Sequence, residues 1–239
     1  MSEASYKLDK EIETVFSHLH DHQDVKKGLE FLEADQAQTL KEQIELAEIS
    51  APPFAETNRA LAYKKKLEEL GLEEVKQDAE GNVYGILKGE RSSPALFVSA
   101  HIDSVFSIDT DVTVTEKDGI YFGAGITDDA RGLAALLSIV RAFKHTGIKP
   151  EADIIFGGTV GEEGPGDLRG VKAFFKENQE VDGFISIDAV SPSAIVYKGT
   201  GSYRYEITYT GSGGHSFGAF GTPSAVHAAW ACNFTHCRP

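Results

Sequence analysis

Hydrophobic residues recur at helical spacing in the N-terminal part of the chain. Within residues 7–49, apolar positions such as Leu40 and Ile44 alternate with charged side chains and predict two helices. The stretch "SAPPFAE" then interrupts this periodicity, because proline is excluded from a helix interior. Helical spacing resumes over residues 58–70 and stops at Gly71, so a third helix is expected there.

From residue 81 onward, short apolar runs alternate with helical patterns. The runs 94–103 and 152–160 are almost continuously apolar, as expected for strands that are buried on both faces. Further strands are predicted over 81–89 and 183–189, and helices over 128–147 and 168–178. Strands that alternate with helices indicate an α/β fold with a central sheet.

The pattern changes after residue 192. Residues 202–211, "SYRYEITYTG", alternate between polar and apolar side chains and predict a half-exposed strand. A helix is predicted to begin near Pro223. We therefore expect two domains, residues 1–192 and residues 193–239.

Composition and charge exclude several classes of partner. The 239 residues have a formal net charge of −14, which opposes binding to a phosphate backbone, so no nucleic acid partner is expected. The N-terminus has no apolar signal segment and no run is long enough to span a membrane, so we expect a cytoplasmic protein without a membrane partner. Both cysteines and the only tryptophan lie within residues 230–239. The body of the chain therefore uses no disulfide, and this tail is atypical.

Candidate metal ligands stand at the ends of three predicted strands and at the start of one predicted helix. They are His101, Asp103, Glu162, Glu163 and Asp188 after the strands, and Asp128 at the helix start. In open α/β sheets, sites form where the carboxyl ends of strands converge. A crevice that combines imidazole and carboxylate ligands suits a borderline cation such as zinc.

Several of these residues also have an ordinary structural explanation. A single histidine after a strand is more often hydrogen-bonded within the fold than bound to a metal. The His-x-Asp spacing strengthens the metal hypothesis, because it places Asp103 on the same face as His101, where it can hold the second ring nitrogen. Asp128 is either a helix N-terminal acid or a carboxylate that bridges two cations, and its neighbour Asp129 is interpreted as a plain helix cap. Asp188 is either a turn residue or a ligand.

The adjacent acids Glu162 and Glu163 lie among glycines in "GTVGEEGPGDLRG". If Glu163 binds a metal ion, Glu162 can act as the general base, because the metal lowers the pKa of the attacking water. The alternative is an exposed acidic turn.

Five motifs together resemble a known family. They are "SAHIDSVF", "GAGITDDARGLAALL", "GTVGEEGPGDLRG", "ISIDA" and "GSGGHSFG", to which the segment "SAPPFAETNRA" can be added. Their order and spacing over roughly residues 45–229 are similar to the two-zinc metallopeptidase family that contains tripeptide aminopeptidase, acetylornithine deacetylase and succinyl-diaminopimelate desuccinylase. The resemblance implies a central mixed sheet flanked by helices, followed by the start of an α+β, ferredoxin-like lid domain.

The resemblance also implies roles for individual residues. Four residues would bind two zinc ions, with cobalt or manganese as substitutes: His101 and Asp188 one ion, Glu163 the other, and Asp128 both. Asp103 would orient His101, and Glu162 would be the general base.

In this family the lid mediates dimerisation, so a homodimer is expected. His215, in "GGHSFG", would stabilise the tetrahedral oxyanion, often in the active site of the neighbouring subunit. Without the resemblance, a structural loop histidine is an equal alternative. The implied activity is zinc-dependent cleavage of small peptides, as in an aminopeptidase, and the alternative is an N-acyl amino acid deacylase.

The chain departs from the family in length. Members continue to a late histidine that binds the second zinc ion, whereas here the resemblance fades within the helix that begins at Pro223. We therefore expect a truncated or frame-shifted product of a longer gene. An inactive fragment and a non-catalytic binding module are the rivals of an active enzyme, although every implied ligand within the matched span is present.

A second histidine cluster, "HLHDH", occupies residues 18–22. It lies in a predicted helix rather than at a strand end, and it lacks the spacing of the metallo-β-lactamase motif that it resembles. We interpret it as a decoy.

Overall fold

The computed structural model describes residues 9–188 and 193–236. The chain divides into two compact units, Met1–Pro192 and Ser193–Pro239, and each is described by itself. The predicted domain boundary adjoins residues 189–192, which lie outside the described ranges, as do residues 237–239 of the atypical tail. None of the described helices has the length and apolar character needed to cross a membrane.

The larger unit begins with four helices: α1 (Lys10–Asp21), α2 (Gln23–Ala34), α3 (Gln36–Ala47) and α4 (Thr57–Glu69). The prediction of two helices within residues 7–49 is therefore wrong, because single residues break the run twice. His22 has an extended backbone, and its side chain accepts a hydrogen bond from the backbone N–H of Asp24. Local side-chain capping of this kind competes with continuation of a helix. Asp35 separates α2 from α3, but its side chain makes no capping hydrogen bond.

The larger unit is built on a five-stranded sheet in the order β1-β2-β6-β3-β7. Its strands are β1 (Glu73–Gln77), β2 (Val83–Leu87), β3 (Arg91–His101), β6 (Ala152–Thr159) and β7 (Val181–Ser186). The pairs β1–β2 and β2–β6 are antiparallel, whereas β6–β3 and β3–β7 are parallel. The expected mixed central sheet is therefore confirmed. The sequence did not predict β1, nor the small hairpin of β4 (Thr115–Lys117) and β5 (Ile120–Phe122).

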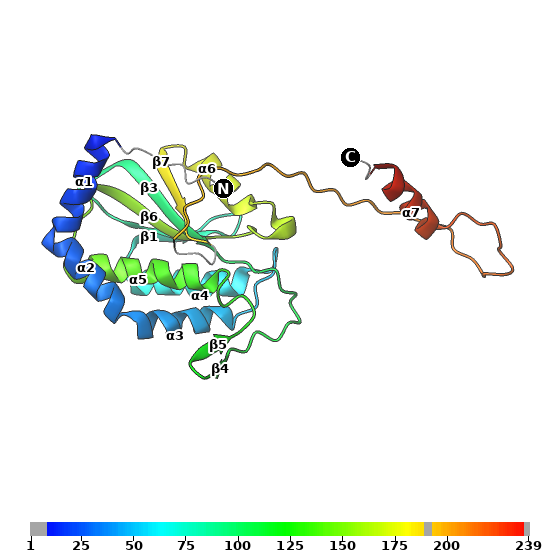
Figure 1. The fold of residues 1–239 in the computed structure, drawn as a ribbon, viewed down its shortest axis with the longest axis horizontal. Helices are drawn as coiled ribbons and strands as arrows, with labels where there is room; N and C mark the ends of the chain where they lie inside the picture. The colour runs from blue at the N-terminus through cyan, green and yellow to red at the C-terminus, as the bar shows by residue number, and fades with distance from the viewer. Residues whose placement is uncertain (1–8, 189–192, 237–239) are drawn as a thin grey trace. The chain divides into compact units, whose positions relative to one another are not determined.

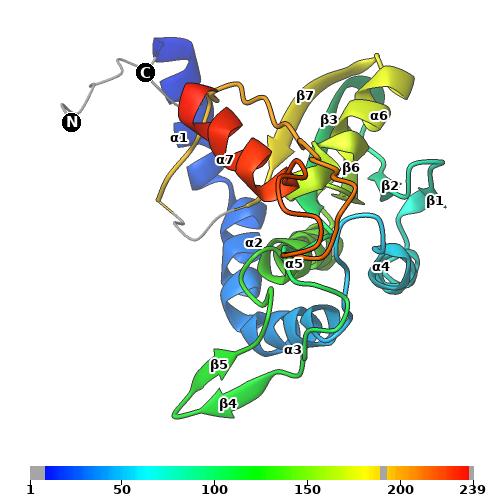
Figure 2. The same ribbon diagram turned by 90° about the vertical axis from the view of Figure 1, so that its right-hand side faces the viewer.

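Helices cover both faces of the sheet, with α3, α4 and α5 (Ala130–Thr146) on one side and α6 (Arg169–Glu177) on the other (Figures 1 and 2). The main core lies under α5, whose Leu133 and Leu137 are fully buried. A smaller core lies under α6, where the ring of Phe174 stacks on that of Phe97 with centroids 3.8 Å apart. The expected helical layers are confirmed.

The parallel strands β6, β3 and β7 end at the same edge of the sheet. The chain leaves β3 at His101, returns through α5 to β6, and the paired ends His101 and Thr159 lie side by side in register. Among the described strands β7 pairs with β3 alone and lies at the edge of the sheet, where Phe184 is 40% exposed and Ile185 is 50% exposed. Loops that follow these strands therefore converge at one edge, as the sequence predicted.

The smaller unit contains the helix α7 (Ala225–His236), which confirms the helix predicted from Pro223. The prediction of a strand over residues 202–211 is wrong, because these residues are irregular, and Tyr203 and Tyr205 are more than four-fifths exposed. A strand must pair its backbone groups with a neighbouring strand, and no strand is assigned among the described residues of this unit. The assignment of this unit to a lid domain stays a prediction.

Candidate metal centre

The structure brings the candidate ligands of the larger unit together at the carboxyl ends of the parallel strands. Two groups of three side chains are close enough to hold a metal ion: His101, Asp128 and Glu163, and His101, Glu162 and Asp188. Within each group the ligand atoms lie within 4.8 Å of one another. A cation with bonds of about 2 Å separates its ligand atoms by roughly 3 to 4 Å, so each group could close around an ion with small side-chain movements.

His101 is the last residue of β3 and is 1% exposed. Its Nε2 lies 2.8 Å from Oδ1 of Asp128. Its Nδ1 lies 2.9 Å from the backbone carbonyl oxygen of Asp103, whereas Oδ1 of the Asp103 carboxylate is 3.7 Å away. The oxygen at hydrogen-bonding distance from the second ring nitrogen therefore belongs to the backbone of Asp103 and not to its predicted carboxylate. The role of Asp103 in orienting His101 stays a prediction.

The Asp103 carboxylate makes a different contact, which sequence reasoning missed. It is fully buried and accepts hydrogen bonds from the backbone N–H groups of Glu162 at 3.0 Å and Glu163 at 2.8 Å. Burial acts to raise the pKa of Asp103, but the His101 ring and these two amide groups outweigh it and hold the pKa below its usual value. The loop that contains both glutamates is thus fixed to the end of β3.

Asp128 and Asp129 stand at the start of α5 and have different surroundings. Asp129 is 2% exposed and accepts hydrogen bonds from the N–H groups of Gly132 at 2.9 Å and His101 at 3.1 Å, so its expected capping role is confirmed. Burial raises the pKa of Asp129 to about 8 despite the opposing effect of His101. The side chain of Asp128 is 52% exposed and faces His101 instead. The side chain of Asp128 is therefore accessible to a metal ion, whereas that of Asp129 ties α5 to β3.

The charges at this edge are mostly negative. Burial raises the pKa of Glu162, and Asp188 adds to the rise against the effect of His101. Burial also raises the pKa of Glu163, and the nearby Asp128 adds to it. Burial acts to lower the pKa of His101, but Asp103 and the other carboxylates outweigh it and raise the pKa to about 10. Carboxylates that repel one another beside a buried imidazole form an environment that a divalent cation would stabilise.

His215 belongs to the smaller unit. Its Nδ1 accepts hydrogen bonds from the backbone N–H groups of Phe217 at 3.3 Å and Gly218 at 3.1 Å, within a glycine-rich turn. Its predicted contact with a reaction oxyanion stays a prediction.

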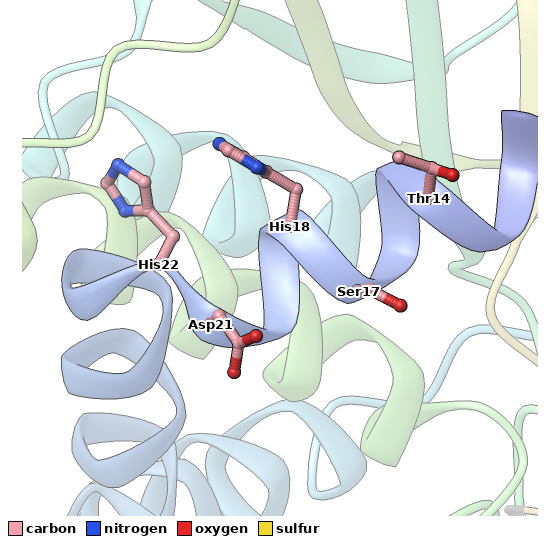
Figure 3. Close-up of a pocket in the computed structure, with 5 residues that line it drawn as sticks. All are labelled: Thr14, Ser17, His18, Asp21 and His22. Atoms are coloured by element: carbon pink, nitrogen blue, oxygen red, sulfur yellow. The ribbon is translucent and has the colours of Figure 1, made fainter.

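The "HLHDH" cluster lies beside a pocket of about 350 Å³ where α1 meets α2 (Figure 3). The pocket is lined by Thr14, Ser17, His18, Asp21 and His22. His18 and His22 lie on one side of the helix in this view, and Asp21 lies on the other. Among the described residues, the groups that could hold a metal ion do not include this cluster.

Comparison with known proteins places this geometry in a family. The sequence model of Peptidase family M28 matches residues 82–214, which is more than half of the 239 residues. The chain belongs to peptidase family M28. The matched span begins at β2 and includes His101, Asp128 and both glutamates, so the family assignment and the candidate centre rest on the same part of the chain.

The relatives of this M28 chain include proteins of the kind that the motifs indicated. It is 33% identical over 132 residues to a probable succinyl-diaminopimelate desuccinylase of Staphylococcus aureus, covering 52% of this chain and 32% of that protein. It is 28% identical over 202 residues to the Bacillus subtilis protein YqjE, covering 80% of this chain and 48% of that protein. The resemblance stated from the motifs is confirmed.

Solved structures show the same fold. The aminopeptidase PepT from Bacillus cereus superposes with a TM-score of 0.56 at 26% identity, covering 65% of this chain and 44% of PepT. A tripeptidase from Staphylococcus aureus superposes with a TM-score of 0.52 at 29% identity, covering 64% and 43% of the two chains. The chain thus spans less than half the length of each of these four relatives.

Proposed function

We propose that the chain contains the metal centre of a hydrolase that cleaves peptide bonds of small peptides, as an aminopeptidase does, and that the metal is zinc. The observation that supports this most directly is the convergence of one imidazole and four carboxylates at the ends of β3, β6 and β7 and the start of α5. Such a donor set fits zinc, which binds histidine nitrogen and carboxylate oxygen. The names of PepT and of the tripeptidase support the choice of peptide substrates.

The residues would divide between two ions. His101 and Asp188 would bind the first ion, Glu163 would bind the second, and Asp128 would bridge them. Asp128 lies within 4.8 Å of ligand atoms of both His101 and Glu163, which supports its position as the bridge. Zinc bound here would polarise the scissile carbonyl and lower the pKa of the attacking water.

Glu162 is the proposed general base. It belongs to the group that also contains His101 and Asp188, and it is partly buried with a raised pKa, as is usual for a carboxylate that exchanges protons during catalysis. It would accept the proton of the attacking water and pass it to the leaving amine. Asp103 would hold Glu162 and Glu163 in position through their backbone amides.

A second candidate is hydrolysis of N-acyl amino acids, favoured by the likeness to probable desuccinylases. Both reactions break an amide bond, so the same centre serves either. We also propose that residues 193–239 begin a lid through which two subunits associate, that His215 stabilises the oxyanion, and that the protein acts in the cytoplasm.

Zinc stoichiometry tests the proposal. The purified chain is equilibrated with excess zinc, desalted and analysed for bound metal beside an Asp128→Ala variant and a Glu162→Gln variant. We expect bound zinc in the wild type and in Glu162→Gln, and a loss in Asp128→Ala. A wild type that retains no zinc would overturn the proposed centre.

Activity separates the two substrate classes. Tripeptides with a free amino terminus are compared with N-succinyl and N-acetyl amino acids on the zinc-loaded chain. Loss of a general base costs about 10²- to 10⁴-fold in rate, so Glu162→Gln should bind zinc but lose activity by about this factor. Cleavage of N-acyl amino acids alone would replace the aminopeptidase assignment by a deacylase.

A further inference from the structure

The two glutamates of the candidate centre lie within residues 160–170, which comprise the loop between β6 and α6 and the first two residues of α6. The two ends of this segment are joined, since the N–H of Gly170 donates to the carbonyl oxygen of Val160 at 3.0 Å. The orientation of Glu162 and Glu163 therefore depends on how the two ends of this segment are held, as well as on the contact with Asp103.

Asn82 holds the two ends of this segment together. It immediately precedes β2 and is fully buried. Its Oδ1 accepts a hydrogen bond from the N–H of Val160 at 3.0 Å, and its Nδ2 donates to the carbonyl oxygen of Gly170 at 2.9 Å. The same Nδ2 donates to the Asp78 carboxylate at 2.7 Å. One side-chain amide thus spans both ends of the loop, which requires a donor and an acceptor on the same short side chain.

The fit around this amide is tight. A Cβ at position 170 would collide with Oδ1 of Asn82 and with the backbone of Val160. At the other end of the loop, Gly161 has a φ of +67°, and a Cβ there would collide with the guanidinium of Arg169. Gly161 and Gly170 are therefore explained by the close approach of neighbouring atoms, which leaves no room for a Cβ.

We propose that Asn82 is a positioning residue for the hydrolytic centre, which fixes the loop of residues 160–170 so that Glu162 and Glu163 meet His101. The inference rests on the proposed function. Asn82 is not among the candidate ligands and acts only through the backbone of the loop. The backbone pairs of the β2–β6 ladder run from Val83 with Gly158 to Leu87 with Ile154, and none of them uses this side chain.

The experiment compares Asn82→Ala with a matched control, Asn178→Ala. Asn178 also donates its side-chain amide to a backbone carbonyl, that of Phe174 at 2.8 Å, but it lies at the opposite end of α6. Zinc affinity is measured by titration calorimetry, and hydrogen exchange of the peptide containing residues 160–170 is measured in the metal-free chain. Unfolding by urea reports any general loss of stability.

We expect Asn82→Ala to weaken zinc binding by about 10- to 100-fold, as is typical when residues that orient metal ligands are removed. Exchange within residues 160–170 should become faster, while Asn178→Ala changes neither quantity. Unchanged loop exchange, or zinc affinity equal to that of the wild type, would overturn the inference. If the wild type binds no zinc, the proposed function fails, and the exchange of the metal-free loop still decides whether Asn82 holds it.

A second variant covers the case in which Asn82→Ala does not fold. Asn82→Asp keeps the acceptor for Val160 but removes the donor to Gly170 and brings a second carboxylate towards Asp78. Hydrogen exchange of residues 160–170 and zinc affinity are then measured on Asn82→Asp. Faster exchange and weaker zinc binding are again expected, and wild-type values of both would refute the inference.

Discussion

Asp35, between α2 and α3, lies at the centre of a partly buried charge cluster that joins α3 to α5. Its Oδ2 accepts hydrogen bonds from Nη2 of Arg141 at 2.6 Å, from Nε of Arg141 at 3.0 Å and from Oγ of Ser138 at 2.7 Å. The side chain is only 9% exposed. Arg141 has a second partner, because its Nη1 donates to Glu42 at 2.7 Å. We predict that Asp35→Asn destabilises the larger unit.

The magnitude follows from these contacts. Hydrogen bonds to charged groups contribute about 1.5–3 kcal/mol to stability. Breaking a buried ion pair can cost about 3–5 kcal/mol when the remaining charge is left alone, but here Arg141 keeps Glu42. We therefore expect D35N to lower the free energy of unfolding at pH 7 by about 1.5–3 kcal/mol. For a chain of this size, each kcal/mol of unfolding free energy corresponds to about 2–4 °C in Tm, so Tm should fall by about 3–12 °C.

The loss should depend on pH with a definite sign. Burial acts to raise the pKa of Asp35, but the hydrogen bonds from Arg141 and Ser138 outweigh it and lower the pKa. A carboxylate with a lowered pKa in the folded state stabilises the fold above its unfolded pKa of about 3.9 and loses that contribution as the pH falls further. The Tm difference between wild type and D35N should therefore have its largest value at pH 7 and decrease below about pH 4.

Thermal unfolding followed by circular dichroism between pH 7 and pH 3.5 measures this difference. Asp21→Asn is the control, because the side chain of Asp21 is 80% exposed and its pair with Lys26 is long at 3.6 Å. Exposed pairs of this kind contribute at most about 1 kcal/mol. A D35N difference that stays constant across this pH range, or that equals the control at pH 7, would refute the reasoning.

Three further predictions concern the core, the glutamate loop and the metal. Leu137→Ala, at a fully buried position of α5, should cost about 2–5 kcal/mol in urea unfolding, and a loss below 1 kcal/mol would show that the site is less well packed than described. Gly161→Ala should lower the free energy of unfolding by more than about 1 kcal/mol, because φ at this position is positive. It should also weaken zinc binding measured by calorimetry, and a wild-type zinc affinity would contradict the role of this glycine. Zinc at a hundredfold excess over its Kd should stabilise the chain by about 2.7 kcal/mol, which corresponds to a rise in Tm of about 5–11 °C. A chelator should remove this rise, and the Asp128→Ala variant should not show it. The same rise in Asp128→Ala would show that zinc binds elsewhere.

The central strands could be predicted from the sequence because they are buried on both faces. β6 and the part of β3 from Ala95 onward are short, mostly apolar and largely buried, as is usual for the inner strands of a parallel sheet. β1, with the sequence "EEVKQ", has one partly buried residue among exposed ones and therefore shows no strand pattern. Its pairing with β2 is a tertiary contact, which a local pattern does not contain.

The opposite error occurs at residues 202–211. Their alternating pattern has a strong preference for strands, yet the described structure there is irregular. An alternating pattern states which face would be buried, but it does not supply the neighbouring strand that the backbone needs.

The members of the candidate centre could be proposed from the sequence because they follow strand ends or, for Asp128, precede a helix. The structure brings ligand atoms of His101, Asp128 and Glu163 within 4.8 Å of one another. The contacts of Asp103 with the amides of the glutamate loop could not be predicted, because they depend on the path of a loop and not on side-chain spacing. The function of Asn82 was missed for the same reason, although "GN" before a strand marks a turn.

The position of β7 at the edge of the sheet has a consequence for the rates at which the two proposed ions exchange with solvent. His101, Asp128 and Glu163 belong to one β3–α5–β6 unit at the centre of the fold. Asp188 follows β7, which has β3 as its one neighbour among the strands that the structure describes. Edge strands with exposed side chains open locally at a lower free energy than central ones. Each opening of β7 would withdraw Asp188 and leave the first ion with His101 and Asp128 alone. This ion should therefore exchange with solvent at the rate at which β7 opens, and not at the slower rate at which the central strands open.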